Sequence, residues 1–282
     1  MKKLIERLLL FFAGLPLLIA IVFFFPHFNY LLLHLAILAC AFFAIIEMRD
    51  LLSRKLPVAP LWFTLVAGLL LPVAAFMHAV FGFPYRLIPF SLVAACVTIL
   101  SYEFFAGFTG KFDHAVGRLS SSFSILLYPG YLIMYLGYMT IWTEAGAYLS
   151  LFFMMVFGCD SLAWFFGMIL GKNNRGLVPA SPNKSLAGFF GGYFGAIAGA
   201  VAAYYMFNPV FAHRLPSLVI IAFVTATAAI IGDIFESVLK RSSSIKDSGS
   251  GVPGRGGVLD SIDSVLLAAP VFYVLTSFLF GL

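Results

Sequence analysis

Nine long apolar segments constrain the fold of this chain more than any other feature of its sequence. Each runs for about 18 to 24 residues between charged or turn-forming residues. A helix of 18 residues is about 27 Å long at 1.5 Å per residue, which is enough to cross the hydrocarbon core of a bilayer. The candidate spans are residues 8–25, 30–47, 60–81, 87–106, 121–142, 147–170, 187–207, 216–236 and 262–281.

The composition agrees with a membrane protein and excludes an ordinary soluble domain. Apolar residues make up 62% of the chain and charged residues only 10%, whereas soluble domains have about 25% charged residues. Because lipid cannot satisfy backbone hydrogen bonds, single spans of this length must be helical. We therefore predict an all-α integral membrane protein, a polytopic bundle of about nine transmembrane helices.

The distribution of basic residues predicts how this bundle is oriented. When the loops are assigned alternately to two sides, fifteen of the seventeen Lys and Arg residues share the side of the N-terminus. Only Arg86 and Arg214 fall on the other side. Cytoplasmic loops carry an excess of Lys and Arg, so we expect the N-terminus inside and the C-terminus outside. The net charge of +5 therefore indicates contact with anionic lipids and not with nucleic acid.

The N-terminal segment has the charge asymmetry of a signal peptide. Its apolar part, residues 8–25, is long enough to span a bilayer and has no cleavage site of the small-x-small type. We expect it to be retained as the first span.

Charge is concentrated in residues 231–263, between the last two apolar segments. This stretch holds five of the twelve acidic residues and four of the seventeen basic ones. Spacings of three and four place side chains on one face of a helix. Such a face is formed by Asp233, Glu236, Ser237, Lys240 and Arg241. After a loop, the same spacing is repeated by Asp260, Asp263 and Ser264.

The loop between these helix ends, SGSGVPGRGG at residues 248–257, is half glycine. Glycine permits positive φ and lets backbone N–H groups approach an anion closely. Carboxylates brought together repel unless a cation intervenes, and a divalent ion with oxygen ligands is the usual solution. The nearby Lys and Arg side chains suit phosphate. The stretch predicts a metal-dependent site for a polyphosphate substrate; a plain cytoplasmic loop would account for the basic residues but not for the carboxylates.

Two further carboxylates, Asp160 and Glu103, lie inside apolar spans. Asp160 shares a helix face with Gly167 and Gly171, whose small size allows another helix to approach. Asp160 is either a buried structural residue or a polar contact to the site, and we favour the contact. Glu103 either makes a hydrogen bond between packed helices or lines a polar cavity.

Residues 231–263 resemble the signature of the phosphatidate cytidylyltransferases (CDP-diacylglycerol synthases), S-x-x-K-R-x4-K-D-x-G-x3-P-G-H-G-G-x-x-D-R-x-D. The matching positions are Ser237, Lys240, Arg241, Lys246, Asp247, Gly249, Pro253, Gly254, Gly256, Gly257, Asp260 and Asp263. Two positions depart from it, because Arg255 replaces the family histidine and Ser261 the family arginine.

The loop after Asp160 is similar to a second family motif, S-P-K-K-T-x-E-G. The matching positions are Ser181, Pro182, Lys184 and Gly188. Asn183 replaces a lysine, Ser185 the threonine and Ala187 the glutamate, so one family charge is missing here.

The resemblance implies transfer of the cytidylyl group of CTP to phosphatidic acid, which gives CDP-diacylglycerol and pyrophosphate. We expect Mg²⁺ to be bound by Asp233 and Asp260, with a second cation left open. The expected catalytic residues are Asp233, Asp260, Lys246 and Asp247. The expected substrate-binding residues are Asp160, Ser181, Lys184, Ser237, Lys240, Arg241, Gly256 and Gly257. Asp247 and Asp263 are further expected to support the metal ligands.

Two other functions stay open. A CTP-dependent lipid-alcohol kinase would use similar membrane chemistry but would transfer the γ-phosphoryl group. A cation-coupled transporter would also contain buried carboxylates, yet it would be expected to show paired interrupted helices in two repeats, a pattern we do not find in the sequence.

The organisation expected from these patterns is one continuous membrane unit. Residues 1–142 form a helical scaffold and residues 143–282 carry the catalytic loops. We expect the protein in the bacterial inner membrane with its active site facing the cytoplasm, among membrane lipids; a homodimer is left open.

Overall fold

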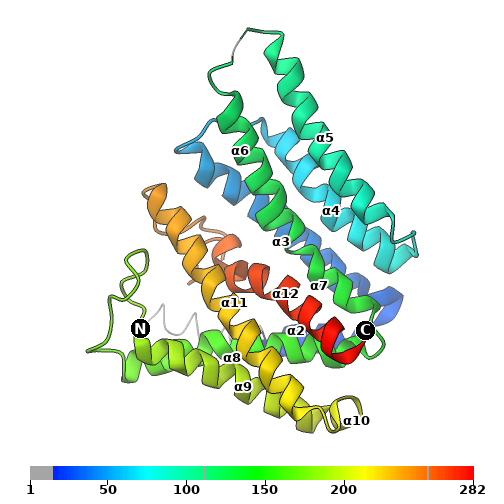
Figure 1. Ribbon diagram of the computed structural model, residues 1–282, viewed down its shortest axis with the longest axis vertical. Helices are drawn as coiled ribbons and strands as arrows, with labels where there is room; N and C mark the ends of the chain where they lie inside the picture. Colours follow the sequence, from blue (N-terminus) through cyan, green and yellow to red (C-terminus); the bar gives the residue numbers. More distant parts are fainter. Residues whose placement is uncertain (1–14, 111, 253) are drawn as a thin grey trace.

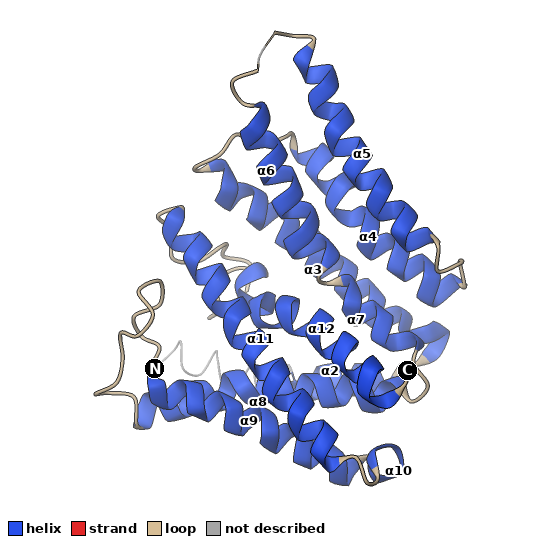
Figure 2. Cartoon of the chain, in the orientation of Figure 1, coloured by secondary structure: helices blue, strands red, loops and turns tan. Residues whose placement is uncertain are grey.

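The computed structural model describes residues 15–110, 112–252 and 254–282. Within these ranges every regular element is a helix, apart from the isolated β-bridges Arg175–Ser185 and Val252–Gly256 (Figure 2). The predicted all-α class is confirmed. The elements are α2 (Leu15–Phe24), α3 (His27–Ser53), α4 (Leu61–Phe81), α5 (Leu87–Gly107), α6 (Ala115–Ile125), η2 (Leu126–Tyr131), α7 (Met134–Tyr138), η3 (Met139–Ile141), α8 (Ala145–Ile169), α9 (Leu186–Met206), α10 (Asn208–Phe211), α11 (Leu215–Ser242) and α12 (Leu259–Phe280).

Eight helical segments in the described part of the chain are long and apolar enough to cross a membrane. They correspond to the second to ninth predicted spans, which are thereby confirmed. The first predicted span, residues 8–25, is described only from Leu15 onward, as α2, and residues 8–14 lie outside the described residues. The position of the N-terminus on the inner side stays a prediction.

The predicted span at residues 121–142 is a composite and not one regular helix. It begins earlier than predicted, at Ala115, and changes to a π-helix at Leu126–Tyr131. Pro129 lies in that π-helix; proline lacks an N–H donor and its ring clashes with the preceding turn of an α-helix. The change of helix type accommodates the proline inside the span.

Arg118, which the sequence placed in a loop, lies in α6 and pairs with Glu103 of α5. Its Nε and Nη2 atoms donate to the two carboxylate oxygens of Glu103 at 2.8 Å and 2.7 Å. Both side chains are largely buried, at 16% and 10% exposed. Of the two roles left open for Glu103, the structure shows a bidentate contact between packed helices.

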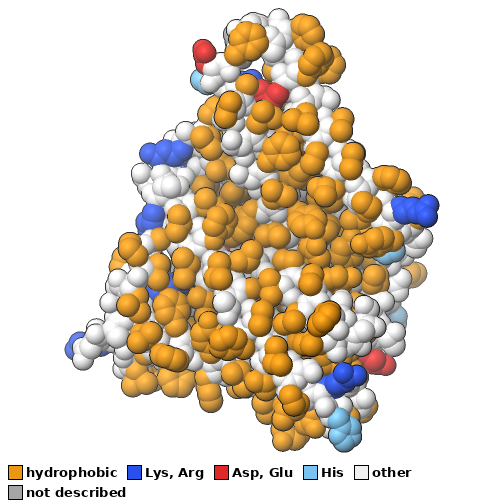
Figure 3. All heavy atoms as spheres, in the orientation of Figure 1, with side chains coloured by type: hydrophobic (Ala, Val, Ile, Leu, Met, Phe, Trp, Pro, Cys, Tyr) orange, Lys and Arg blue, Asp and Glu red, His pale blue; other side chains and the backbone are white. Residues whose placement is uncertain are grey.

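The helices form two groups, and α12 contacts both of them. In Figure 1, α3, α4, α5 and α6 run steeply through the upper half, and α8 and α9 lie across the lower half. Helix α8 packs along α9, α11 packs along α12, and α11 also contacts α9. Hydrophobic side chains cover most of the face in Figure 3, and charged ones lie near its edges, as expected for a surface in contact with lipid.

Glycines bring α8 and α9 into close contact around Asp160. A Cβ atom added to Gly195 of α9 would lie less than 3.0 Å from the carbonyl of Gly158 in α8. Nearer the loop, a Cβ on Gly167 would lie 3.7 Å from Cα of Gly188. The prediction that small residues near Asp160 allow a helix to approach is confirmed.

Another glycine sets the register of the antiparallel pair formed by α11 and α12. A Cβ atom on Gly232 would lie 2.5 Å from the carbonyl oxygen of Asp263. Asp233 is therefore level with Asp263. Asp260, which lies three residues earlier in α12, is one helical turn closer to the glycine loop, a step of about 5 Å along the axis.

Candidate active site

Lys240 occupies the centre of the charged cluster between α11 and α12. Its ammonium group forms ion pairs with Glu236, one turn earlier in α11, and with Asp260 at the start of α12. The side chain of Glu236 is fully buried and that of Asp260 is 5% exposed. Because Lys240 is the counter-charge of two buried carboxylates, it links the two helices electrostatically.

The face predicted for α11 is present in part. Glu236, Ser237 and Lys240 are buried together, whereas Arg241 is exposed. Arg241 donates from Nε to the carbonyl of Ala180 at 3.1 Å and from Nη1 to that of Ile245 at 2.9 Å. Arg241 therefore ties the loop after α8 to the end of α11.

Asp260 also closes the glycine loop. Its Oδ2 atom accepts hydrogen bonds from the backbone N–H of Ser248 at 2.8 Å and of Gly257 at 2.7 Å. The hydroxyl of Ser248 lies 2.9 Å from the same oxygen. One carboxylate thus joins both ends of residues 248–257 to Lys240.

The loop after α8, which contains the second family motif, contacts α11 through Lys184. Its Nζ atom lies 2.6 Å from Oδ2 of Asp233, and the side chains are 19% and 38% exposed. Ser181 lies in the turn before it, where its carbonyl accepts from the N–H of Lys184 at 3.0 Å. The second family motif is therefore in contact with α11 through the Lys184–Asp233 ion pair.

Asp160 and Asp263 meet beside Asp233. The hydroxyl of Ser264 lies 3.2 Å from Oδ1 of Asp160 and 3.3 Å from Oδ1 of Asp263. Asp233 directly follows Gly232, which packs against the carbonyl of Asp263. Carboxylates from α8, α11 and α12 therefore lie in one region, and the contact of Asp160 to the substrate stays a prediction.

Gly256 shows the two properties expected of the loop glycines, a positive φ and a close approach to an anion. The anion it approaches is a carboxylate of the protein itself. Gly256 has a φ of +114°, and a Cβ atom there would lie 2.6 Å from Oδ2 of Asp260. In this loop the N–H groups of Ser248 and Gly257 donate to Asp260, and the N–H of Val258, which follows the loop, donates to Glu47 of α3. Lys246 and Asp247, on the same loop, are exposed.

The two departures from the first family motif, Arg255 and Ser261, are in contact with each other. Arg255 donates from Nη1 to the carbonyl of Ser261 at 3.3 Å. The hydroxyl of Ser261 donates to the carbonyl of Gly257 at 2.9 Å. Both replacements therefore take part in the hydrogen bonding of the loop.

Glu47 is a site residue that the sequence analysis missed. It lies near the end of α3, and its carboxylate accepts from the backbone N–H of Val258 at 2.9 Å and of Leu259 at 2.7 Å. The available signal was an ionisable residue at the end of an apolar span.

Tyr128 of η2 is a second residue near the site that the sequence did not predict. Its ring packs edge-on against Phe235 of α11, with centroids 5.0 Å apart. The buried hydroxyl of Tyr128 has no hydrogen-bond partner among the described residues.

The described residues contain no group of three His, Cys, Asp or Glu side chains arranged to hold a metal ion. Lysine nitrogens contact both expected ligands, Asp233 and Asp260. Mg²⁺ is commonly bound through one or two carboxylates, with water and substrate phosphates completing the octahedron. Asp233 and Asp260 are oxygen ligands of the type that such an ion accepts, and each is paired with a lysine in this structure.

Gly257→Ala is expected to destabilise the folded loop by about 1–3 kcal/mol, because overpacking forces neighbours to move. Its Cβ atom would lie less than 3.0 Å from both Ser248 Oγ and Glu47 Oε2. The measurement is the free energy of unfolding in mixed micelles. Gly251→Ala in the same loop is the control, since nothing lies within 4 Å of a Cβ there. Equal stability of the two variants would contradict the close approach at Gly257.

Comparisons with known proteins agree with the family resemblance. The profile of the Cytidylyltransferase family matches residues 5–279. A phosphatidate cytidylyltransferase of Thermotoga maritima is 36% identical over 63% of this chain and 66% of the relative. A protein of the same name from Haemophilus influenzae is 34% identical over 63% of this chain and 62% of the relative. A third, from Staphylococcus saprophyticus, is 34% identical over 66% and 68%.

The matched region spans less than two thirds of the length of the first two relatives. The family profile, in contrast, covers the chain almost from end to end. The protein therefore belongs to the cytidylyltransferase family.

Proposed function

We propose that this protein transfers the cytidylyl group of CTP to phosphatidic acid and releases pyrophosphate. The observation that carries the proposal is a pair of lysine–carboxylate contacts, Lys184 with Asp233 and Lys240 with Asp260, at one end of α11 and α12. Each lysine is a point charge that suits phosphate, and each carboxylate is a ligand that suits a divalent ion. The names of the relatives supply the substrate class.

In the proposed reaction, an oxygen of phosphatidate attacks the α-phosphorus of CTP, and the bond to pyrophosphate breaks. The attacking oxygen belongs to a phosphate monoester that is already an anion near neutral pH, so no strong general base is required. Positioning of two polyanions and neutralisation of their charge would then supply most of the rate. Lys184 and Lys240, which contact Asp233 and Asp260, would supply part of that neutralisation.

In this proposal Asp233 and Asp260, which lie about one helical turn apart along the α11–α12 pair, would hold Mg²⁺. When bound, the ion would reduce the repulsion between phosphate oxygens. Asp160 and Asp263 form no ion pair within 4 Å among the described residues, and they are the carboxylates that would hold a second cation. The lysines released from their carboxylates would then be available to phosphate.

The exposed residues of the loop complete the proposed nucleotide site. Lys246 and Asp247, which are exposed, would meet CTP from solvent, together with Arg241 in the last turn of α11 and Ser181 in the loop after α8. Ser237 is buried beside Lys240 and would contact substrate only through a local rearrangement. Because Gly256 and Gly257 lack a side chain, the carboxylates of Asp260 and Glu47 can lie against the loop backbone. We place this site at the cytoplasmic face of a bacterial inner membrane, where CTP is available.

The position of the transferred phosphorus tests the reaction. The purified protein is placed in liposomes that contain phosphatidic acid, with Mg²⁺ and CTP labelled at either the α- or the γ-phosphate. We expect the α-label in the lipid and the γ-label in pyrophosphate. Appearance of the γ-label in a lipid alcohol would indicate a kinase instead. Movement of a solute without CTP consumption would indicate a transporter.

A further inference from the structure

The first turn of α12 has no capping residue of its own. The first four N–H groups of a helix have no partner within it and are usually satisfied by a side-chain oxygen just before the helix. Val258 occupies that position and has no such oxygen. The carboxylate of Glu47, from α3, supplies the missing acceptors. Its Oε1 accepts from the N–H of Val258 at 2.9 Å, and its Oε2 accepts from the N–H of Leu259 at 2.7 Å.

Glu47 is also connected to Asp260 through one side chain. The hydroxyl of Ser248 lies 2.9 Å from Oε2 of Glu47 and 2.9 Å from Oδ2 of Asp260. It accepts in turn from the backbone N–H of Asp260 at 3.3 Å. A hydroxyl has a single proton to donate, so Ser248 is shared between the two carboxylates and fixes one relative to the other.

The glycine loop is folded closely around Glu47. A Cβ atom on Gly249 would lie 2.5 Å from Oε1 of Glu47, and one on Gly257 would lie less than 3.0 Å from Oε2. Glycine at both positions therefore creates the space for a carboxylate that comes from more than 200 residues earlier in the chain.

We propose that Glu47 is a positioning residue of the active site: it holds the glycine loop and the first turn of α12 against α3, and through Ser248 it orients Asp260 toward Lys240 and the substrate. The catalytic part of this inference rests on the proposed function. The structural part does not, because it concerns hydrogen bonds within the chain. Glu47 touches neither Lys240 nor Lys184 directly, so its effect on the reaction passes through Asp260.

Glu47→Gln tests the proposal with little change of shape. An amide has one acceptor oxygen and an NH₂ group, which cannot accept from the donors that Oε1 and Oε2 now serve. The matched control is Asp50→Asn, on the same helix one turn further on. Asp50 is 64% exposed, and its ion pair is with Arg49 at 3.6 Å.

The first measurement is hydrogen exchange of the backbone amides of Val258 and Leu259 in the full-length protein in micelles. We expect exchange to be about tenfold faster or more in Glu47→Gln, since hydrogen bonds to a charged group are among the stronger ones. Asp50→Asn should exchange like the wild type. Unchanged exchange in Glu47→Gln would overturn the proposal whether or not the protein transfers cytidylyl groups.

The second measurement is the Mg²⁺ concentration that gives half the maximal rate of cytidylyl transfer. We expect it to rise at least several-fold in Glu47→Gln, with a lower kcat and an unchanged KM for phosphatidate. A purely structural loss would reduce the amount of active protein and leave this concentration unchanged, and that result would overturn the positioning role. An inactive wild type would contradict the proposed function alone, because the exchange measurement would still decide the contacts of Glu47.

Ser248→Ala provides a second test of the proposal if Glu47→Gln does not fold. This variant removes the bridge between Glu47 and Asp260 but leaves the bonds of Glu47 to α12. We expect normal exchange at Val258 and Leu259 together with a raised Mg²⁺ requirement. A normal Mg²⁺ requirement in this variant would contradict the connection to Asp260.

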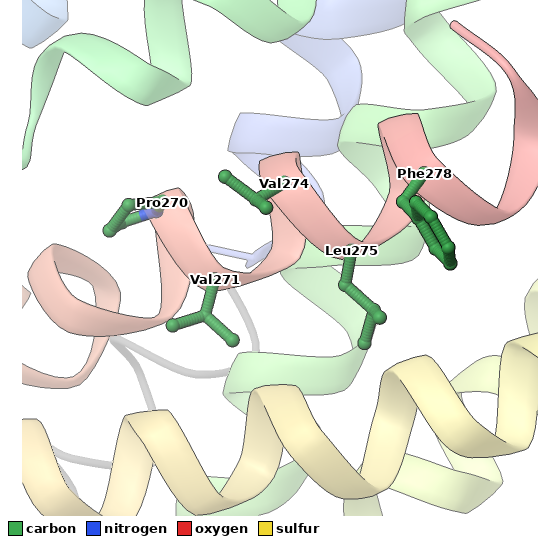
Figure 4. A pocket seen from close by; sticks show the side chains of 5 residues that line it. All are labelled: Pro270, Val271, Val274, Leu275 and Phe278. Carbon is green, nitrogen blue, oxygen red and sulfur yellow. The ribbon is translucent and has the colours of Figure 1, made fainter.

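Helix α12 also has an apolar hollow on its surface. Pro270, Val271, Val274, Leu275 and Phe278 line it (Figure 4). An apolar surface is expected on any helix that faces lipid.

Discussion

Asp260→Asn is expected to lower kcat for cytidylyl transfer by about 100-fold or more, the size of effect seen when one preorganised electrostatic contact is removed. Oδ1 of Asp260 faces Lys240, and Oδ2 accepts from the N–H groups of Ser248 and Gly257. An asparagine amide can satisfy one of these sides but not both. In one orientation its NH₂ group meets the ammonium of Lys240, and in the other it meets two backbone donors.

The measurement for Asp260→Asn is the initial rate in proteoliposomes at saturating CTP and phosphatidate. Asp113→Asn is the matched control, because Asp113 is an exposed aspartate on a loop remote in sequence from the site. We expect its rate to equal that of the wild type. A rate for Asp260→Asn within about twofold of the control would remove Asp260 from catalysis.

Lys240→Met is expected to destabilise the protein by about 3–5 kcal/mol, the usual cost of leaving a buried charge without its partner. The side chain of Glu236 is 0% exposed, and its ion pair is with Lys240. Oε1 of Glu236 has no hydrogen-bond partner among the described residues. Removal of the ammonium therefore leaves this carboxylate with no compensating charge in direct contact.

The free energy of unfolding in mixed micelles measures this effect. Lys246→Met is the control, since Lys246 is exposed and a surface change of this kind usually alters stability by less than about 0.5 kcal/mol. The double variant Glu236→Gln with Lys240→Met should recover part of the loss, because it removes the buried charge as well. If the double variant were less stable than Lys240→Met alone, the account of this pair would be wrong.

The helices could be predicted from the sequence because apolar length alone determines what can cross a bilayer. Eight of the nine predicted spans correspond to helices of sufficient length. The span near Pro129 was less predictable, since a proline inside an apolar run is compatible with a kink, a break or a change of helix type. Arg118 illustrates the consequence: the sequence placed it in a loop, and the structure places it in α6 against Glu103.

The residues of the candidate site were predictable because charge is rare in this chain. Ionisable residues at the ends of apolar spans are usually functional, so the sequence alone indicates Asp233, Lys240 and Asp260 as site candidates. Their partners were not predictable. Helical spacing relates Lys240 to Glu236 within α11, but only the register set by Gly232 brings Asp260 to the same lysine.

Glu47 shows the limit of sequence reasoning most clearly. It is a single glutamate at the end of a span, followed by a loop with several other charges. Nothing local distinguishes it from a residue that merely marks the membrane boundary. Its role depends on contacts with residues more than 200 positions away. The division of the chain at residue 142 stays a prediction, and Glu47 adds a contact across it.

The most direct test of the account is the stoichiometry and metal dependence of the reaction in proteoliposomes that contain phosphatidic acid. CDP-diacylglycerol and pyrophosphate are quantified together while Mg²⁺ is removed by a chelator and then restored. The account predicts one pyrophosphate for each CDP-diacylglycerol, no product in the chelator and recovery on addition of Mg²⁺. Consumption of CTP without CDP-diacylglycerol, or an undiminished rate in the chelator, would contradict it.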